Sequence, residues 1–359
     1  MAALAIRSAL RSTAACIARY ALQLACVTSI CAAQDLPPLP IPVTNAAVAS
    51  GTIERVQWIV SLLGVDSTKR WSGITQRAHA WTSETRQWRR LPDVPGPHGR
   101  LAASAQIVRD RVFLLGGYTV DSAGKERSVA NVDIYDPRQR EWRRGADIPV
   151  AIDDAVIGVY RDSLLYVVSG WHDTNSVQTV QLYDVVRDAW YATTPIPGPG
   201  VFGHSGGLSG NTIVFVDGAV RQAGPVKYRL ISQVWIGTID KEQPTIISWR
   251  TGPAHPGPPV YRAAVGVCGS QIVFAGGTAN PYNYNGVGYD GRPSEPVALA
   301  FGFDTKRGTW EQGPPLTSPS MDHRGMAIVG DTAWILGGMR AKQAVSASLD
   351  RISLKGCRK

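Results

Sequence analysis

The chain has 359 residues, of which 37 are lysine or arginine and 28 are aspartate or glutamate, so its formal net charge is +9 at pH 7. It contains no dense basic run and no alternation of aromatic and basic residues, which argues against a nucleic-acid-binding protein. A moderate positive excess suits an anionic small molecule as the ligand.

The first 33 residues predict a secretory signal peptide that is not part of the fold. Three arginines precede an apolar run over residues 20–30, and small residues follow before a cleavage site near Gln34. The apolar run is too short to span a bilayer as a helix. We therefore expect an exported mature protein (residues 34–359) that is periplasmic or secreted, is not inserted in a membrane and has a formal net charge of +6.

Two of the five cysteines, Cys268 and Cys357, remain after removal of the leader. An oxidising compartment permits them to form a disulfide. The alternative is a buried Cys268 thiol and a loose C-terminal tail.

A pair of residues that ends in glycine closes an apolar strand six times along the chain. A tryptophan returns between these pairs at spacings of 54, 48, 59 and 61 residues, and in three units an aromatic-Asp pair precedes it, with Asp six residues before Trp. The pairs are Leu63-Gly64, Gly116-Gly117, Ser169-Gly170, Asp217-Gly218, Gly276-Gly277 and Gly337-Gly338, and the tryptophans are Trp88, Trp142, Trp190, Trp249 and Trp310.

Each of these units predicts four short strands. The Asp residues suit tight turns, and a proline-broken stretch after each tryptophan cannot continue a strand ladder. A strand of small residues, such as residues 101–105, suits a crowded position near a symmetry axis. We therefore predict an all-β propeller with six blades, four antiparallel strands per blade and one domain over residues 34–359.

The tryptophan strand is present in only five of the six units, so one blade must be completed in another way. The mature N-terminus (residues 35–40) has the composition of a segment that follows a tryptophan strand. We predict that it closes the ring by pairing with the C-terminal blade. The alternative of two open ends would leave bare strand edges.

Polar residues precede the inner strands, which converge at one end of the central channel of a propeller. Three arginines are candidate anchors for a carboxylate, because guanidinium binds carboxylate through two hydrogen bonds. Two further residues, His204 and Asp154, are candidates for acid-base chemistry. The alternative is that these residues cap strands and bridge blades. The full set is Asn45, Arg100, Asp153, Asp154, His204, Arg262, His323 and Arg324.

A second candidate site is the loop over residues 278–292 in the fifth unit, which is rich in tyrosine and asparagine. Tyrosine rings stack on sugars and asparagine amides bond hydroxyl groups, so Tyr282, Asn283 and Tyr284 are candidate ligand-binding residues. The alternative is a polar insertion without a ligand.

The sequence predicts neither a metal nor a cofactor. His98, His204 and His323 precede inner strands in alternate units, but their registers differ and no carboxylate pattern supports a three-histidine site. Nucleophile elbows, phosphate-binding loops and dinucleotide fingerprints are absent from the sequence.

The glycine pairs, aromatic-Asp turns and spaced tryptophans resemble kelch repeats over nearly all of the mature chain. Finer features are similar to the exported, six-bladed N-acetylneuraminate epimerase (sialic acid mutarotase) family: the blade number, the segment 233–240 followed by Trp249, and the segment 272–277 that leads into the Tyr/Asn loop. The resemblance implies an isomerase of a free sugar acid, with a proton acceptor for the anomeric hydroxyl and cations that anchor the carboxylate.

One position departs from that family, which carries a glutamate as proton acceptor directly after the fourth glycine pair. This chain has Ala219 there. Asp217 lies two residues earlier, on the same strand face by simple alternation, and is a candidate replacement. Lys227 and Arg229 are loose matches for an arginine of the family's downstream loop. Whether any reaction is catalysed stays open at this point.

Two classes of function follow. The first is an exported propeller that binds a small acidic sugar or glycan in its central channel, with or without mutarotase activity. The second is a non-enzymatic scaffold whose loops bind an envelope protein or a glycan. An inward-facing arginine cluster favours the first class, and an exposed aromatic rim favours the second. We expect a monomer in either case.

Overall fold

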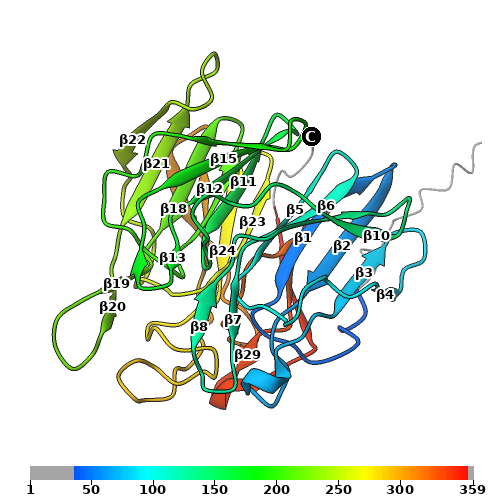
Figure 1. The fold of residues 1–359 in the computed structure, drawn as a ribbon. Helices are drawn as coiled ribbons and strands as arrows, with labels where there is room; N and C mark the ends of the chain where they lie inside the picture. The colour runs from blue at the N-terminus through cyan, green and yellow to red at the C-terminus, as the bar shows by residue number, and fades with distance from the viewer. Residues whose placement is uncertain (1–35, 355–359) are drawn as a thin grey trace, which may run out of the picture. The chain divides into compact units, whose positions relative to one another are not determined.

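The computed structural model describes residues 36–354, and from Pro37 onward they form an all-β fold of antiparallel sheets arranged as the blades of a propeller (Figure 1). The expected signal peptide and Cys357 lie outside the described residues. Cys268 is disulfide-bonded, so of the two alternatives left open by the sequence the free buried thiol does not apply. Within residues 36–354, no helix has the length and apolar character needed to cross a bilayer.

Six sheets, numbered here in chain order, are the blades. Blade one contains β1 (Ala47–Ile53), β2 (Val56–Leu62), β3 (Ala78–Thr82) and β4 (Trp88–Leu91), and blade two contains β5 (Ser104–Val108), β6 (Arg111–Leu115), β9 (Val132–Asp136) and β10 (Glu141–Arg144). Blade three contains β11 (Val156–Tyr160), β12 (Leu164–Val168), β15 (Val180–Asp184) and β16 (Ala189–Ala192), and blade four contains β17 (Ser205–Ser209), β18 (Thr212–Val216), β21 (Val234–Ile239) and β22 (Ile247–Thr251). Blade five contains β23 (Ala264–Cys268), β24 (Gln271–Ala275), β25 (Ala300–Asp304) and β26 (Thr309–Gln312), and the described part of blade six contains β27 (Ala327–Val329), β28 (Thr332–Leu336) and β31 (Leu349–Ser353).

Short insertions separate the second and third strands of each blade. In blades two, three, four and six they are two-stranded hairpins: β7 (Tyr118–Val120) with β8 (Glu126–Ser128), β13 (Trp171–His172) with β14 (Asn175–Ser176), β19 (Ala219–Arg221) with β20 (Tyr228–Leu230), and β29 (Met339–Arg340) with β30 (Ala344–Val345). Blade one carries a loop with the 3-10 turn η1 (Trp71–Gly73), blade six also carries η2 (Ala341–Gln343), and blade five carries the long loop over residues 278–294. These insertions gather at one end of the ring, the lower end in Figure 1.

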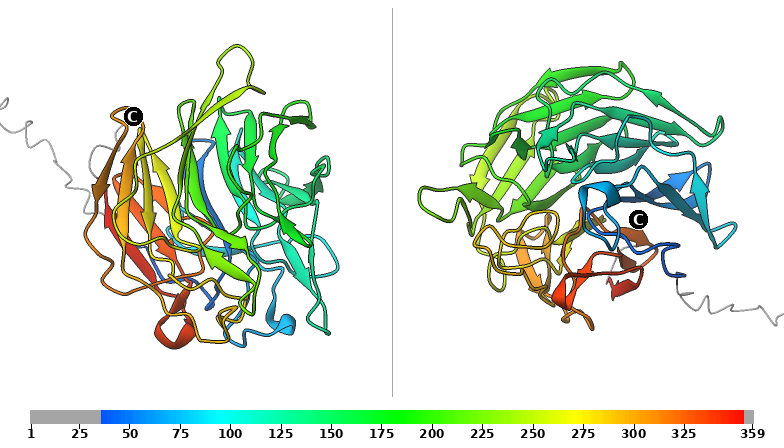
Figure 2. Two further views of the ribbon diagram at one scale, coloured as in Figure 1. Left: turned by 90° about the vertical axis from the view of Figure 1, so that its left-hand side faces the viewer. Right: turned by 60° about the horizontal axis from the view of Figure 1, so that its bottom comes forward.

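The inner strands close a ring around the axis. They contact one another in the order β1, β5, β11, β17, β23 and β27, and β27 contacts β1 again. The N-terminal segment is bound to blade six, because Leu39 N donates to Ala347 O at 2.9 Å and Val43 N donates to Ser346 O at 3.2 Å. The predicted six-bladed ring, closed by its N- and C-terminal segments, is therefore confirmed; the right-hand view of Figure 2 shows the blades around the axis.

The repeated tryptophans fasten neighbouring blades. Each indole Nε1 donates to a backbone carbonyl in the proline-broken segment that follows the outer strand of the preceding blade, or in the N-terminal segment for blade one. The bonds run from Trp88 to Pro37, Trp142 to Pro92, Trp190 to Ala146, Trp249 to Thr194 and Trp310 to Pro253. Pro37 O accepts from Trp88 in the same way as Pro92 O accepts from Trp142. The N-terminal segment therefore occupies the position that, in the other blades, is taken by the segment after a tryptophan strand.

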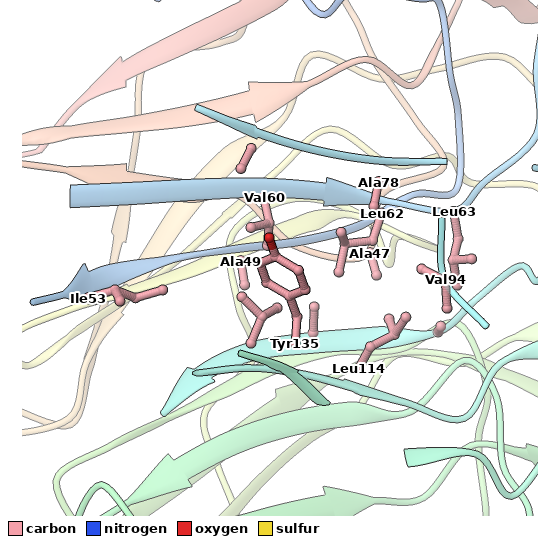
Figure 3. Packing of buried hydrophobic residues seen from close by; sticks show 14 residues of the cluster. Ala47, Ala49, Ile53, Val60, Leu62, Leu63, Ala78, Val94, Leu114 and Tyr135 are labelled. Atoms are coloured by element: carbon pink, nitrogen blue, oxygen red, sulfur yellow. The ribbon is translucent and has the colours of Figure 1, made fainter. Parts of the chain in front are cut away.

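Apolar side chains fill the spaces between blades. Figure 3 shows the cluster between blades one and two, where Ala47, Leu62, Leu114 and Tyr135 are all buried. The inner strands approach so closely that a Cβ added to Gly158 in β11 would lie 2.3 Å from the Cβ of Leu208 in β17. This crowding explains why small residues recur in these strands.

One residue per blade has a left-handed backbone at the junction between the insertions and the inner strands. We call these six residues the hub; their φ values lie between 51° and 71°. The residue before each hub position forms a β-bridge with the start of its own blade's insertion, as Leu101 does with Tyr118. The hub residues are Asn45, Ala102, Asp154, Gly203, Arg262 and Asp322.

Candidate functional site

Side chains of the hub form a buried network of ion pairs. Arg262 donates to Asp154 from Nε at 3.0 Å and from Nη2 at 2.6 Å, and its Nη1 donates to Asp322 Oδ1 at 3.1 Å. Arg324 adds a further pair, with 2.6 Å between its Nη1 and Asp154 Oδ1. All four side chains are at most 3% exposed. Two guanidinium groups are thus matched by two carboxylates, which leaves them poorly suited to anchor the carboxylate of a ligand.

Asn45 completes this network instead of facing a ligand. Its Nδ2 donates to Asp322 Oδ1 at 2.8 Å, and its Oδ1 accepts from the backbone N of Ala102 at 2.5 Å. The hydroxyl of Thr44 donates to the other oxygen of Asp322 at 2.7 Å.

The two neighbouring carboxylates, Asp153 and Asp154, differ in their proton affinity. Burial opposes ionisation of Asp154, but Arg262 and Arg324 outweigh it, so the pKa of Asp154 is lowered. Burial and the adjacent charge of Asp154 hold the pKa of Asp153 well above its usual range, which favours its protonated form. Its Oδ2 accepts a hydrogen bond of 2.6 Å from the hydroxyl of Ser128 in β8.

Arg100 is not part of this arrangement. Its guanidinium forms a buried ion pair with Asp133 of β9 and donates from Nη1 to Gly116 O at 3.2 Å. The structure therefore brings Arg262 and Arg324 together on Asp154 and places Arg100 within blade two. The expected cluster of three arginines does not form.

A channel of about 490 Å³ runs along the inner strands, on the side of the hub away from the insertions. Its wall consists mostly of small and apolar residues, with His204, His323 and Arg324 beside the hub. His204 Nε2 lies 3.0 Å from Val168 O and must donate to it, which leaves Nδ1 as an acceptor without a hydrogen-bond partner among the described residues. Burial and the charge of Arg324 lower the pKa of His204 to about 4.

His323 is a second neutral imidazole at this end of the channel. Burial, together with Arg340 and Arg324, lowers its pKa to about 3, and its Nε2 is hydrogen-bonded to the hydroxyl of Ser320 at 2.8 Å. Across residues 36–354, no three side chains of histidine, cysteine, aspartate or glutamate are grouped closely enough to hold a metal ion.

Asp217 lies away from the axis. Its carboxylate is 3.0 Å from His255 Nε2 through both oxygens and accepts from the backbone N of Val260 at 2.8 Å. Asp217 has a φ of 59°, which interrupts strand alternation, so its side chain and that of Ala219 point to different places. Ala219 is fully buried against Phe202 in an aromatic cluster. The expectation that Asp217 shares the face of Ala219 is therefore wrong.

The long loop of blade five is held by its own hydrogen bonds, and its tyrosines have different environments. Tyr282 is fully buried, packs at 5.3 Å against Tyr261, and lies with that ring beside the guanidinium of Arg262. Asn283 Oδ1 accepts from the backbone N of Tyr284 at 2.8 Å, whereas the Tyr284 side chain is only half-buried. Of the three predicted loop residues, Tyr284 is the one whose ring is accessible.

Four tyrosines from three blades lie at the insertion end, within the electrostatic influence of one carboxylate, that of Glu126. We call Tyr118, Tyr228, Tyr284 and Tyr289 the tyrosine cluster. The rings of Tyr228 and Tyr289 lie 4.5 Å apart. Burial raises the pKa of all four phenols, and the charge of Glu126 raises each of them further. The hairpins that carry Tyr118 and Tyr228 both project from the lower end of the ring in Figure 1.

Glu126 and Arg221 are the charged residues of this region that the sequence analysis missed. Both are solvent-exposed, and within the described chain neither side chain forms an ion pair or hydrogen bond. Glu126 is paired across its hairpin with Val120, and Arg221 with Tyr228. The only sequence signal is strand alternation, which places Glu126 on the face of Tyr118 and Arg221 on the face of Tyr228.

The sheets around a central channel, with their buried hub, define a six-bladed β-propeller. A family model for the Kelch motif matches residues 99–149. The chain is a kelch-repeat β-propeller.

Several known proteins share this repeat. The chain is 29% identical over 170 residues to Kelch-like protein terF of Aspergillus terreus (45% of this chain and 36% of that protein). It is 32% identical over 121 residues to Kelch-like protein 15 of Mus musculus (34% of this chain and 20% of that protein). It therefore spans only about a third or less of the length of these relatives. The solved structure of YjhT has a TM-score of 0.71 and 15% identity, covering 89% of this chain and 97% of YjhT, a likeness that shows the fold alone.

Proposed function

We propose that this propeller binds a free sugar acid at the tyrosine cluster, on the insertion side of the hub, and interconverts its anomers. This is an isomerase activity of the mutarotase type and needs no cofactor. The observation that carries the proposal is the presence of four tyrosines at the insertion end together with one exposed carboxylate, Glu126, which acts electrostatically on all four and has no partner among the described residues. Aromatic rings stack on the apolar faces of sugars, and the phenol hydroxyls bond sugar hydroxyls.

Arg221 supports an acidic ligand. Its guanidinium projects from the same hairpin face as Tyr228 and is close enough to lower the pKa of that phenol. Unlike Arg262 and Arg324, it has no carboxylate partner among residues 36–354, so it is available to bind the carboxylate of a sugar. The carboxylate anchor of this proposal is therefore Arg221, whereas Arg262 and Arg324 pair with carboxylates of other blades.

The resemblance of the repeat pattern to sugar-acid mutarotases supports the same reaction class. The proposal includes a periplasmic or secreted location, because residues 1–33 resemble a secretory signal, and a monomeric state. Cell fractionation and size-exclusion chromatography with light scattering test these two points directly.

The experiment that tests the binding proposal is calorimetric titration of the mature protein with N-acetylneuraminate and with neutral hexoses. Tyr289→Ala removes a ring of the cluster and is expected to weaken binding of every sugar about tenfold or more, since one stacked ring contributes on the order of 1.5 kcal/mol. Arg221→Gln is expected to lower the affinity for the sugar acid without lowering the affinity for neutral sugars.

Arg229→Gln is the matched control, because Arg229 lies on the same hairpin as Arg221 but is paired with Val220, on the opposite face. If both arginine variants lost the same affinity for the sugar acid, the effect of Arg221→Gln would be due to the change in surface charge and not to a specific contact. Absence of heat with every sugar in the wild type would refute the binding proposal.

A second candidate function is a non-enzymatic scaffold for an envelope protein or glycan. It is favoured by exposed apolar side chains at the edges of blades three and four: Val186 (63% exposed), Tyr191 (42%) and Ile246 (44%). This scaffold would be the better account if no sugar bound to the wild type and if Tyr191→Ser and Ile246→Ser abolished binding to immobilised envelope glycan while leaving the melting temperature unchanged.

A further inference from the structure

We propose that Glu126 is the proton-transfer group of this site, so that the carboxylate for anomer interconversion comes from the hairpin of blade two. This inference rests on the proposed function, since it assigns a role within the same reaction. It is carried by the position of Glu126 on the inner face of the hairpin, the face that also carries Tyr118 of the tyrosine cluster.

The register of the hairpin sets the direction of Glu126. Tyr118 is paired with Ser128, and Val120 is paired with Glu126, so these four residues share one face. That face points inward, because Ser128 donates to Asp153 at the hub and Val120 is buried beside Tyr118. Arg127 lies between Glu126 and Ser128 and projects from the opposite face. Glu126 is therefore held in a strand, on the hairpin face from which Ser128 reaches Asp153.

The surroundings of Glu126 suit reversible proton transfer. The groups that act on it or respond to it are Asp154 and Arg262 of the hub, Asp153 next to the hub, Tyr118 of its own hairpin, and Tyr228, Tyr284 and Tyr289 of the other insertions. Burial raises the pKa of Glu126, the charge of Arg262 opposes this, and Asp154 adds to it. A pKa raised towards neutrality improves both donation and acceptance of a proton.

The other carboxylates near the axis are occupied. Asp154 is bound by Arg262 and Arg324, and Asp322 is bound by Asn45, Thr44 and Arg262. Asp217 is sequestered by His255 between blades. Asp153 is buried, and it is hydrogen-bonded to Ser128. Among the acidic residues described around the axis, Glu126 thus combines solvent access with the absence of a partner.

The chemistry at this group balances without an oxidant or reductant. The carboxylate of Glu126 accepts the proton of the anomeric hydroxyl, whose electron pair forms a carbonyl. The bond between the anomeric carbon and the ring oxygen breaks, and the ring oxygen takes a proton from water. After the carbonyl turns, the new hydroxyl adds to its other face and returns a proton to that water's hydroxide. The carbonyl oxygen regains the proton from Glu126.

The test is to compare sugar binding by calorimetry with anomer exchange by NMR magnetisation transfer, using N-acetylneuraminate as the probe. Glu126→Gln is expected to retain binding within about threefold and to lower the exchange rate about 100-fold or more, since a positioned acid-base group typically contributes two to four orders of magnitude. Glu126→Asp is expected to restore part of the rate. The wild-type rate is expected to rise with pH through an ionisation above the ordinary carboxyl value, a step that Glu126→Gln removes.

The control is Glu242→Gln, an exposed glutamate in the turn between β21 and β22, which is expected to change neither measurement. Wild-type exchange in Glu126→Gln, with binding intact, would overturn the assignment of Glu126 and leave the proposed function standing. A wild type that binds no sugar, or that binds without exchange, would overturn the proposed function itself. Loss of binding in Glu126→Gln would make the residue a binding group and would also overturn the proton-transfer role.

Discussion

Arg324 of blade six forms an ion pair with Asp154 of blade three, with 2.6 Å between Nη1 and Oδ1. Blades three and six are opposite each other in a ring of six, so this pair crosses the axis. Arg262 of blade five binds the same carboxylate with two hydrogen bonds across 108 residues of sequence. These ion pairs therefore connect blade three with blades five and six, which are not its neighbours in the ring. They lie between the channel and the insertions.

The first prediction concerns the stability of this connection. Asp154→Asn removes the carboxylate that both Arg262 and Arg324 require and leaves two buried guanidinium groups without it, which is expected to lower the free energy of unfolding by about 3–5 kcal/mol. Urea denaturation measures this loss. The exposed pair Arg90–Asp93 provides the contrast, since Asp93→Asn is expected to cost at most about 1 kcal/mol. A loss in Asp154→Asn as small as that of the surface pair would contradict the role of the hub.

The second prediction separates the arginines by function. Arg100→Gln leaves the buried carboxylate of Asp133 without its nearest cation and is expected to destabilise the fold by about 3 kcal/mol. Because Arg100 lies inside blade two, the affinity for a sugar acid, measured by calorimetry on the folded variant, is expected to remain that of the wild type. Selective loss of sugar-acid binding in Arg100→Gln would return this residue to the ligand site and argue against Arg221 as the anchor.

The fold could be predicted because its signals repeat. Residue pairs ending in glycine, turns with Asp six residues before Trp, and strands of small residues recur at intervals of one blade. Each blade therefore supports the prediction made for the next. The tryptophans read as markers of a strand also proved to be hydrogen-bond donors to the preceding blade. Closure by the N-terminal segment followed from the same counting.

Which polar side chains meet at the axis was less predictable than the fold, because a shift of one residue along the chain changes where a side chain points. Asn45, Asp154 and Arg262 occupy the same hub position, but His204 lies one residue later, and Arg100 two residues earlier, than the hub position of its own blade. The left-handed hub residue interrupts alternation, so such differences send side chains to the axis, to the channel or between blades. Sequence spacing alone treated these positions as equivalent.

Glu126 was missed for a related reason. Its direction follows from the pairing of residues 118–120 with residues 126–128, and that register is set by the turn between them. Because no repeat signal marks the insertions, the sequence gives no second instance against which to check the register. In the sequence, Glu126 therefore looks like any charged residue in an exposed polar turn.

The third prediction is a pH dependence of stability from the two neutral histidines beside the channel. The pKa values of His204 and His323, about 4 and about 3, lie below the ordinary 6.5, so the unfolded chain binds protons that the folded chain does not. Stability from each histidine is complete above pH 6.5 and is lost as the pH falls towards the folded values. We expect each to account for about 2 kcal/mol of the loss between pH 8 and pH 5.

This dependence is checked by urea denaturation at several pH values between 5 and 8. His204→Gln is expected to flatten the profile, because glutamine does not titrate and can still donate to Val168 O. His98→Gln, at an exposed histidine, is expected to leave the profile as it is in the wild type. If the stability of His204→Gln fell as steeply with decreasing pH as that of the wild type, the predicted contribution of His204 to the pH dependence would be contradicted.

The fourth prediction concerns Ala219, where the resembled family carries a glutamate. Ala219 is fully buried against Phe202 and Tyr261, so Ala219→Glu forces a methylene group and a carboxylate beyond Cβ into an aromatic cluster. Overpacking and desolvation are expected to cost about 3 kcal/mol or more, visible as a lower melting temperature, with no gain in anomer exchange. Ala219→Gln separates volume from charge and is expected to lose less. If Ala219→Glu instead kept wild-type stability and accelerated exchange, the acceptor would belong in blade four, and the assignment to Glu126 in blade two would have to be withdrawn.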